Sequence, residues 1–270
     1  QVPSTVIRTN TLKVTREQLL SNLEAEGVVA QKVNQVSEAV NLIDYSAIEK
    51  LKPFQSGEFL VQGLSSMLVG HFLNPGDEVV VDLCSAPGGK TTHLAQLMNN
   101  QGLIFAVDVH QHKLELIKDN CQRLGIENVK MVCADGREFD IDKPVDKVLV
   151  DAPCSGLGII GKKPEIKWQK KPQDLKQLQQ LQLELLTNAA ELVKDGGEII
   201  YSTCTFTQQE NQEVINKFLK KFDNFSLSSL TTEANKLGVE DYLIDNHLQL
   251  LPTSELIEGF FIAKLNKNEL

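Results

Sequence analysis

The feature that most constrains this chain is an alternation, from Phe59 onward, of short apolar segments with longer segments of helical periodicity. The apolar segments are predicted strands at 79–83, 103–107, 129–133, 147–150 and 198–201. Continuous apolar strands are typical of a parallel sheet that is covered by helices on both faces. Predicted helices at 111–124 and 172–193 lie between them. The alternation therefore predicts an α/β fold with a mostly parallel sheet.

The first 55 residues have a different pattern, which predicts a small α+β module. A strand is expected at 5–8. A helix is expected to begin after Thr15, with Gln18 in the capping-box position, and to end at Gly27. We therefore divide the chain into residues 1–55 and residues 56–270. In the second part, segments 247–251 and 259–265 are predicted to form an antiparallel edge pair.

Polar side chains stand at or just after the ends of the predicted parallel strands. They are Asp82, Asp108, Asp135, Asp151 and Cys204. In parallel sheets the ligand lies beyond the carboxyl ends of the strands, so these side chains are expected at one ligand-binding edge. The alternative for each aspartate is that it only caps the end of its strand.

A glycine loop follows the first of these strands and is predicted to bind a cofactor. Its residues are Cys84, Ser85, Ala86, Pro87, Gly88, Gly89 and Lys90. The loop is neither the GxGxxG fingerprint nor a P-loop, and similar turns also join strands to helices without a ligand. Asp108 can accept hydrogen bonds from ribose hydroxyls, and Asp135 from an adenine amino group. With no second half-site for a dinucleotide, an adenosine with a short zwitterionic tail fits best, which indicates S-adenosylmethionine. Asp151, at the same edge, is predicted to complete the cofactor pocket.

The composition restricts the location and the cofactors of the protein. Five cysteines without CxxC spacing argue against a disulfide framework and against a zinc site, so we expect no metal and a reducing cytoplasm. No apolar run approaches the ~20 residues of a membrane span, and the N-terminus does not resemble a signal peptide. Because the chain lacks an initiator Met, we expect it to come from a longer or processed protein. We expect a monomer, although no pattern specifies the oligomeric state.

The net charge of −9 argues against a broad nucleic-acid-binding face, but one segment is locally basic. Residues 161–172 contain five lysines and one glutamate, together with the only tryptophan, Trp168. Positive charge beside a stacking ring suits single-stranded nucleic acid, and Lys162, Lys163 and Lys167 are the candidate contacts. A solvated face is the alternative. Arg8, in the segment 8–13, is either part of a surface turn or an RNA contact.

Two cysteine motifs, Asp151-Ala152-Pro153-Cys154 and Ser202-Thr203-Cys204-Thr205, complete the pattern. Together with the glycine loop, they resemble the Nol1/Nop2/Sun family of RNA 5-methylcytosine methyltransferases, above all its bacterial small-subunit ribosomal RNA branch. The resemblance implies a Rossmann-like class I methyltransferase that uses S-adenosylmethionine and acts on C5 of a cytosine, most directly in 16S ribosomal RNA. The NusB-like domain of that branch has no counterpart in these residues. Ser254–Glu258 replace the usual glycine-rich stretch.

The chemistry of cytosine explains the need for a thiol, because C5 is too weak a nucleophile to attack a sulfonium methyl directly. A thiolate that adds to C6 makes C5 reactive. The resemblance implies that Cys204 adds to C6, that Cys154 assists release, and that Asp151 holds the cytosine edge. It also places Lys90 near the RNA backbone. A structural thiol in a tight proline turn is the alternative for Cys154.

Three other functions fit parts of the pattern. A methyltransferase for protein, small molecules or amino groups is disfavoured because Asp151-Ala152-Pro153 ends in Cys154, where amino methylation favours a proline followed by an aromatic residue. A catalytically inactive RNA-binding protein is disfavoured by the retained cysteines and aspartates. A nicotinamide oxidoreductase is disfavoured by the missing GxGxxG.

Overall fold

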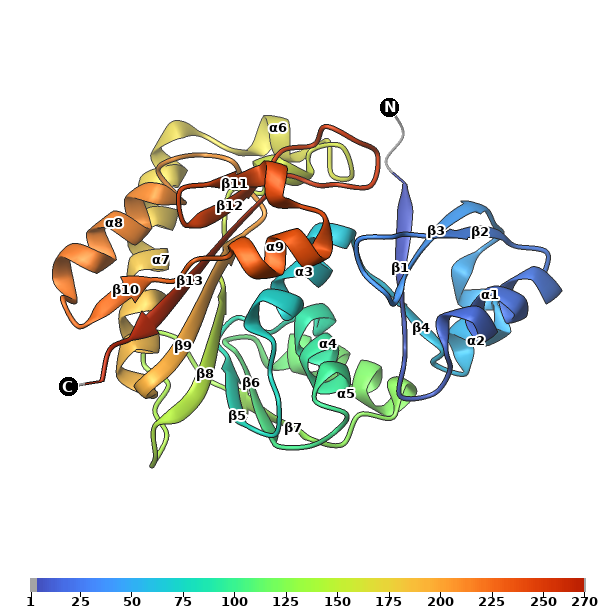
Figure 1. Ribbon diagram of the computed structural model, residues 1–270, viewed down its shortest axis with the longest axis horizontal. Coiled ribbons are helices and arrows are strands. Elements are labelled where there is room, and N and C mark those ends of the chain that lie inside the picture. The colour runs from blue at the N-terminus through green and yellow to red at the C-terminus, as the bar shows by residue number, and fades with distance from the viewer. Residues whose placement is uncertain (1–3, 270) are drawn as a thin grey trace.

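The computed structural model describes residues 4–269, which form a large sheet covered by helices and a small sheet beside it (Figure 1). Five neighbouring strands of the large sheet run parallel. Their order is β7 (Val129–Cys133), β6 (Leu103–Asp108), β5 (Val79–Asp82), β8 (Val145–Asp151) and β9 (Val193–Thr203). The predicted α/β fold with a mostly parallel sheet is therefore confirmed.

Helices cover both faces of this sheet because alternate strand residues point to opposite sides. On one face, Val80 and Ile200 pack with α3 (Leu64–Leu73), α4 (Gly89–Leu97) and α5 (Gln111–Leu124). On the other, Val81 and Tyr201 pack with α7 (Pro172–Leu192) and α8 (Gln212–Lys221). The predicted helix at 111–124 is confirmed as α5, whose C-cap is Gly125 in the left-handed conformation.

The C-terminal part of the large sheet is antiparallel. β12 (His247–Leu250) pairs with β13 (Phe260–Lys267), as predicted. β13 joins this pair to β9, and only the two-residue β11 (Leu243–Ile244) lies outside β12, so the pair lies next to the edge of the sheet. A short β10 (Phe225–Leu227) adds to β13, and α9 (Thr231–Leu237) and the single turn η3 (Glu240–Tyr242) connect these strands.

The small sheet is antiparallel, with the order β2 (Val29–Lys32), β3 (Ala39–Asp44), β1 (Thr5–Thr9) and β4 (Phe59–Val61). Its helix α1 (Arg16–Ala25) begins with the predicted capping box of Thr15 and Gln18 and packs Leu19 and Leu23 against the sheet. Two short turns, η1 (Ile48–Lys50) and α2 (Lys52–Gln55), precede β4. β4 follows the predicted limit at residue 55 and still belongs to this sheet.

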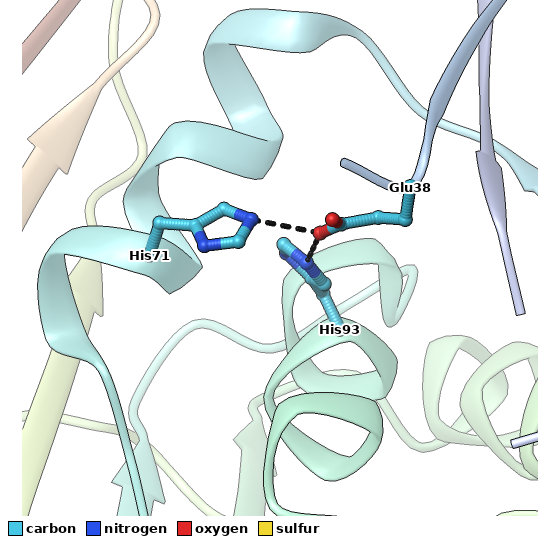
Figure 2. Close-up of side chains that lie close together, drawn as sticks. All are labelled: Glu38, His71 and His93. Carbon is cyan, nitrogen blue, oxygen red and sulfur yellow. Dashed lines mark hydrogen bonds and ion pairs between the residues drawn. The ribbon is translucent and has the colours of Figure 1, made fainter. Parts of the chain in front are cut away.

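A cluster of buried polar side chains joins the small sheet to α3 and α4. Glu38, in the turn between β2 and β3, accepts hydrogen bonds at Oε1 from Nε2 of His71 at 2.7 Å and of His93 at 2.8 Å (Figure 2). Burial lowers the pKa of His93 to about 4, so it is neutral at neutral pH. A histidine that binds a metal through one ring nitrogen normally donates a hydrogen bond from the other. Nδ1 of His93 has no partner among the described residues, so the cluster lacks this feature of a metal site. The cluster therefore has the geometry of a hydrogen-bonded junction.

Candidate active site

The strand order reverses between β5 and β8, because the chain leaves β5 towards β6 on one side and later adds β8 on the other. Ligands of open α/β sheets bind beyond the strand ends at such a reversal. Asp82, at the end of β5, is fully buried and accepts a hydrogen bond from Oγ1 of Thr91 at 2.7 Å. Burial raises the pKa of Asp82 to about 7. Asp82 therefore anchors α4 at the strand ends where the strand order reverses.

The two cysteines of the sequence motifs meet at this edge. Asp151 of β8 lies opposite Ser202 of β9, so Cys154 and Cys204 both follow just beyond paired strand ends. Their Sγ atoms are 3.2 Å apart, and both thiols are free and partly buried. The backbone holds the two loops together as well, since the amide of Gly158 donates to the carbonyl of Cys204 at 3.0 Å.

The contact between the sulfurs makes the two thiols unequal. The hydrogen bond from Cys154 lowers the pKa of Cys204 against the opposing effects of burial and of the Asp151 carboxylate, and the Lys90 cation lowers it as well. The same hydrogen bond, together with burial, raises the pKa of Cys154 well above its usual value. The arrangement favours a thiolate at Cys204 beside a protonated Cys154, and only the thiolate is a nucleophile.

Lys90 and Asp151 form an ion pair next to the sulfurs. Nζ of Lys90 donates to Oδ2 of Asp151 at 2.7 Å, while Oγ of Ser202 donates to Oδ1 at 2.8 Å. Burial acts against the charge of Lys90, but Asp151 outweighs it and raises the pKa of the ammonium. The Lys90 side chain is only 11% exposed, so it belongs to the thiol site. Its contact with the RNA backbone stays a prediction.

A cavity of about 420 Å³ reaches Pro153, and its volume is within the ~300–1,000 Å³ of small-molecule sites. Asp108 and Asp135, the two carboxylates predicted to bind the adenosine, both line it, and so does Pro153, the neighbour of Cys154. Asp108 accepts a hydrogen bond from the amide of His110 at 2.9 Å. Asp135 forms hydrogen bonds through both oxygens to Arg137, which lower its pKa. A cofactor contact of Asp135 would share this carboxylate with Arg137.

Of the glycine loop, only the first residue lines the cavity. Cys84 lines the cavity, and burial raises the pKa of its thiol, which disfavours a thiolate there. The hydroxyl of Ser85 donates to the carbonyl of Val107 at 3.0 Å and has no proton left for a cofactor. Gly88 has a φ of +97°, and a Cβ there would lie 3.2 Å from Ile117, so α4 needs glycine at its start. Ala86, Pro87 and Gly89 do not line the cavity, and their contact with a cofactor stays a prediction.

The lysine-rich segment follows the Cys154 loop through η2 (Leu157–Ile159) and α6 (Ile166–Gln169). Buried Ile166 anchors it, while Trp168 is 82% exposed, with Nζ of Lys167 at 5.4 Å from the ring centroid. Lys163 is exposed as well. Lys162 differs, since its ammonium forms an ion pair with Glu258 at 2.5 Å. Three of the four RNA contacts predicted in this segment, Lys163, Lys167 and Trp168, are therefore exposed, whereas the fourth is paired with a carboxylate.

Both alternatives for Arg8, a surface turn and an RNA contact, are wrong, because Arg8 lies in β1 and its side chain is 1% exposed. Its guanidinium donates to the carbonyl of Gly89 at 2.8 Å and to Oγ1 of Thr92 at 3.0 Å, and burial lowers its pKa to about 9. Arg8 therefore holds the start of α4, which carries Lys90. A pattern of polar residues in an N-terminal strand could not distinguish this buried role from a surface one.

One buried residue of the site was not predicted from the sequence. Glu210 is 0% exposed and accepts hydrogen bonds from the Cys154 loop. It lies in Gln208-Gln209-Glu210-Asn211-Gln212, a polar run in which no spacing distinguishes a buried carboxylate from a solvated one.

Two family models match the chain. Residues 71–266 match "16S rRNA methyltransferase RsmB/F", and residues 1–49 match the "Methyltr_RsmF/B-like, ferredoxin-like domain". Among the described residues, no helix is both long and apolar enough to cross a membrane.

Individual proteins agree with these matches. "Probable ribosomal RNA small subunit methyltransferase B" of Bacillus subtilis (strain 168) is 40% identical over 98% of this chain and 60% of its own length. The "tRNA (cytosine(72)-C(5))-methyltransferase" of Pyrococcus horikoshii is 35% identical over 82% of this chain and 55% of its own length. The chain thus spans about 60% of the first of these relatives.

Solved structures match as well. The crystal structure of NSun6 from Pyrococcus horikoshii with SFG has a TM-score of 0.88 and 25% identity, covering 100% of this chain and 92% of that one. The crystal structure of a methyltransferase homolog protein from Pyrococcus horikoshii has a TM-score of 0.83 and 34% identity, covering 99% and 87%. The fold is that of a Rossmann-like class I methyltransferase. By sequence and by fold, this chain belongs to the RsmB/F family of 16S rRNA methyltransferases.

Proposed function

We propose that this protein transfers a methyl group from S-adenosylmethionine to C5 of a cytosine in RNA, through a covalent bond between Cys204 and C6. The observation that carries the proposal is the pair of thiols 3.2 Å apart at two strand ends, beside a cavity that Pro153 helps to line. We propose 16S ribosomal RNA in the cytoplasm as the substrate, because the family model and the Bacillus subtilis relative both name a small-subunit enzyme.

The residues around the cavity fit S-adenosylmethionine. When bound, this cofactor supplies an electrophilic methyl group. Asp108 is proposed to accept hydrogen bonds from its ribose hydroxyls, as carboxylates at this strand end do in dinucleotide folds. The Asp108 side chain accepts one backbone hydrogen bond, from His110, and so keeps lone pairs for further donors.

The reaction starts at Cys204. Its thiolate adds to C6 of the cytosine, which breaks the C5–C6 double bond and makes C5 the nucleophile. C5 then takes the methyl group, whose bond to the sulfonium sulfur breaks with the electron pair staying on that sulfur. Asp151 is proposed to hold the N3/N4 edge of the base in its protonated, electrophilic form. Lys90 acts to lower the pKa of Cys204, while the carboxylate of Asp151, with which Lys90 is paired, acts to raise it.

The reaction ends with the release of Cys204. A base removes the proton from C5, its electron pair restores the C5–C6 double bond, and the bond between Sγ of Cys204 and C6 breaks. Cys154 is proposed to assist this step. Its raised pKa keeps a proton at 3.2 Å from the departing sulfur, where it can stabilise the returning thiolate through a hydrogen bond.

The proposal is tested by incubating the protein with methyl-labelled S-adenosylmethionine and either 16S ribosomal RNA, small-subunit particles or tRNA, followed by digestion to nucleosides. We expect label in 5-methylcytidine from the 16S samples. Label in another nucleoside or in protein would contradict C5 methylation, and label from tRNA alone would replace the proposed substrate.

Asp108→Ala is expected to weaken cofactor binding by about 1.5–3 kcal/mol, since charge-assisted hydrogen bonds to the ribose are lost. Isothermal titration calorimetry with S-adenosylmethionine measures the change. Asp119→Ala, on the exposed side of α5, is the matched control and should bind as the wild type does. Wild-type affinity in Asp108→Ala, or tighter binding of NADH than of S-adenosylmethionine, would overturn the cofactor assignment.

We also propose that the segment 161–172 contacts RNA. Replacing the exposed Lys163 and Lys167 together by glutamine should reduce the slope of log affinity against log salt by about 1.4, because ~0.7 counterion is released per phosphate of a single strand. Filter binding at several salt concentrations measures the slope. The control variant replaces Lys220 and Lys221 of α8 by glutamine. An unchanged slope in the first variant would leave the segment as a solvated face.

A further inference from the structure

A buried carboxylate lies behind the two thiols, in the loop between β9 and α8. Glu210 is 0% exposed, and among the described residues no lysine, arginine or histidine forms an ion pair with it. A buried charge without a cation is costly unless hydrogen bonds satisfy it. The bonds that Glu210 accepts therefore indicate what the charge does in this fold.

Four hydrogen-bond donors saturate the Glu210 carboxylate. Oε1 accepts from the amide of Ser155 at 2.7 Å and from Nε2 of Gln182 at 3.1 Å. Oε2 accepts from Oγ of Ser155 at 2.5 Å and from Oγ1 of Thr207 at 2.8 Å. An ionised carboxylate offers about four acceptor sites, so none is left over. Two of the four bonds come from Ser155, the residue next to Cys154.

The same carboxylate reaches the Cys204 loop through a directed chain. Oγ of Ser155 also lies 2.9 Å from Oγ1 of Thr205, the residue next to Cys204. Since the single proton of the Ser155 hydroxyl points to Glu210, Thr205 must be the donor in this second bond. The chain thus runs from Thr205 to Ser155 to Glu210. Gln182 also donates to the carbonyl of Pro153 at 2.9 Å, which ties the other side of the Cys154 loop to the same group.

We propose that Glu210 is a positioning residue, which sets the relative placement of the Cys154 and Cys204 sulfurs and keeps the proton on Cys154. The inference rests on the proposed function of the two thiols. Glu210 touches neither sulfur and acts through Ser155 and Thr205. Its negative charge, buried behind the Cys154 loop, opposes a thiolate at Cys154 and leaves the ionised state to Cys204.

The test compares the alkylation rates of the two cysteines by iodoacetamide in wild type and Glu210→Gln, with peptide mass spectrometry to separate the sites. Glutamine keeps the shape of the side chain and removes its charge. The ratio of the Cys204 rate to the Cys154 rate is expected to fall at least about tenfold, which corresponds to a relative change of one pKa unit. Glu213→Gln, three residues away and exposed, is the control and should keep the wild-type ratio.

A purely structural Glu210 would lower the melting temperature and leave the ratio of rates unchanged, and that result would overturn the inference. If Glu210→Gln does not fold, Ser155→Ala decides, since it removes the link to Thr205 and leaves the carboxylate in place. Ser155→Ala should also lower the ratio of the Cys204 rate to the Cys154 rate. A wild-type ratio in this variant would contradict the inference. Alkylation needs no RNA, so the two proposals can fail separately. If the ratio of alkylation rates shifts in Glu210→Gln but the wild-type protein makes no 5-methylcytidine, the proposed function is refuted and the inference about Glu210 stands.

Discussion

Replacing Cys204 by alanine is expected to lower the rate of methyl transfer by about 10³-fold or more and to leave no covalent RNA–protein species. The reason is that Cys204 supplies the thiolate that adds to C6. The remaining thiol, Cys154, loses the hydrogen bond to Cys204 in this variant, but its burial still raises its pKa. Methylation is measured with labelled S-adenosylmethionine, and the adduct as an RNA-shifted band that survives denaturing electrophoresis.

Replacing Cys154 by alanine should also slow turnover, but for the opposite reason. Cys204 is still present and forms the adduct, which then resolves slowly, so the shifted band should accumulate in Cys154→Ala and vanish in the double variant. Cys121→Ala, a buried thiol in α5 away from the site, is the control. A stable adduct in Cys204→Ala and none in Cys154→Ala would reverse the two roles. Adducts in none of the variants would remove the support for a covalent mechanism.

Replacing Asp151 by asparagine is expected to lower kcat by about 10²–10⁴-fold, the usual contribution of a positioned proton-transfer group. Asparagine retains an oxygen that Ser202 or Lys90 can reach, but it carries no charge to favour the protonated form of the cytosine. Single-turnover methylation with saturating cofactor measures the chemical step.

Two controls make this result specific. Asp223→Asn changes an exposed carboxylate far along the chain from the site and should keep the wild-type rate. The affinity of Asp151→Asn for S-adenosylmethionine reports separately on the second role predicted for Asp151, as a cofactor ligand. A wild-type kcat in Asp151→Asn would show that the carboxylate does not act on the cytosine.

Features that depend on neighbouring residues could be predicted from the sequence. The ends of α5 and β7, the capping box of Thr15 and Gln18, and the turn at Gly88 follow from helical spacing, strand periodicity and glycine, which act within a few residues. The meeting of Cys154 and Cys204 could be predicted as well. Once two apolar strands are expected to be parallel, the residues that follow them share one edge of the sheet.

Only the tertiary structure decided which polar side chains are buried and what they contact. Arg8 looked like a surface arginine and instead donates to Gly89, which lies 81 positions later. Glu210 looked like part of a solvated run and instead accepts hydrogen bonds from Ser155, 55 positions earlier. Lys162 belongs to a basic segment and is paired with Glu258. The sequence alone determined the sheet, the glycine loop and the reactive residue types, because periodicity and turns are local. The partners of a buried charge come from distant segments, and only the packed chain fixes them.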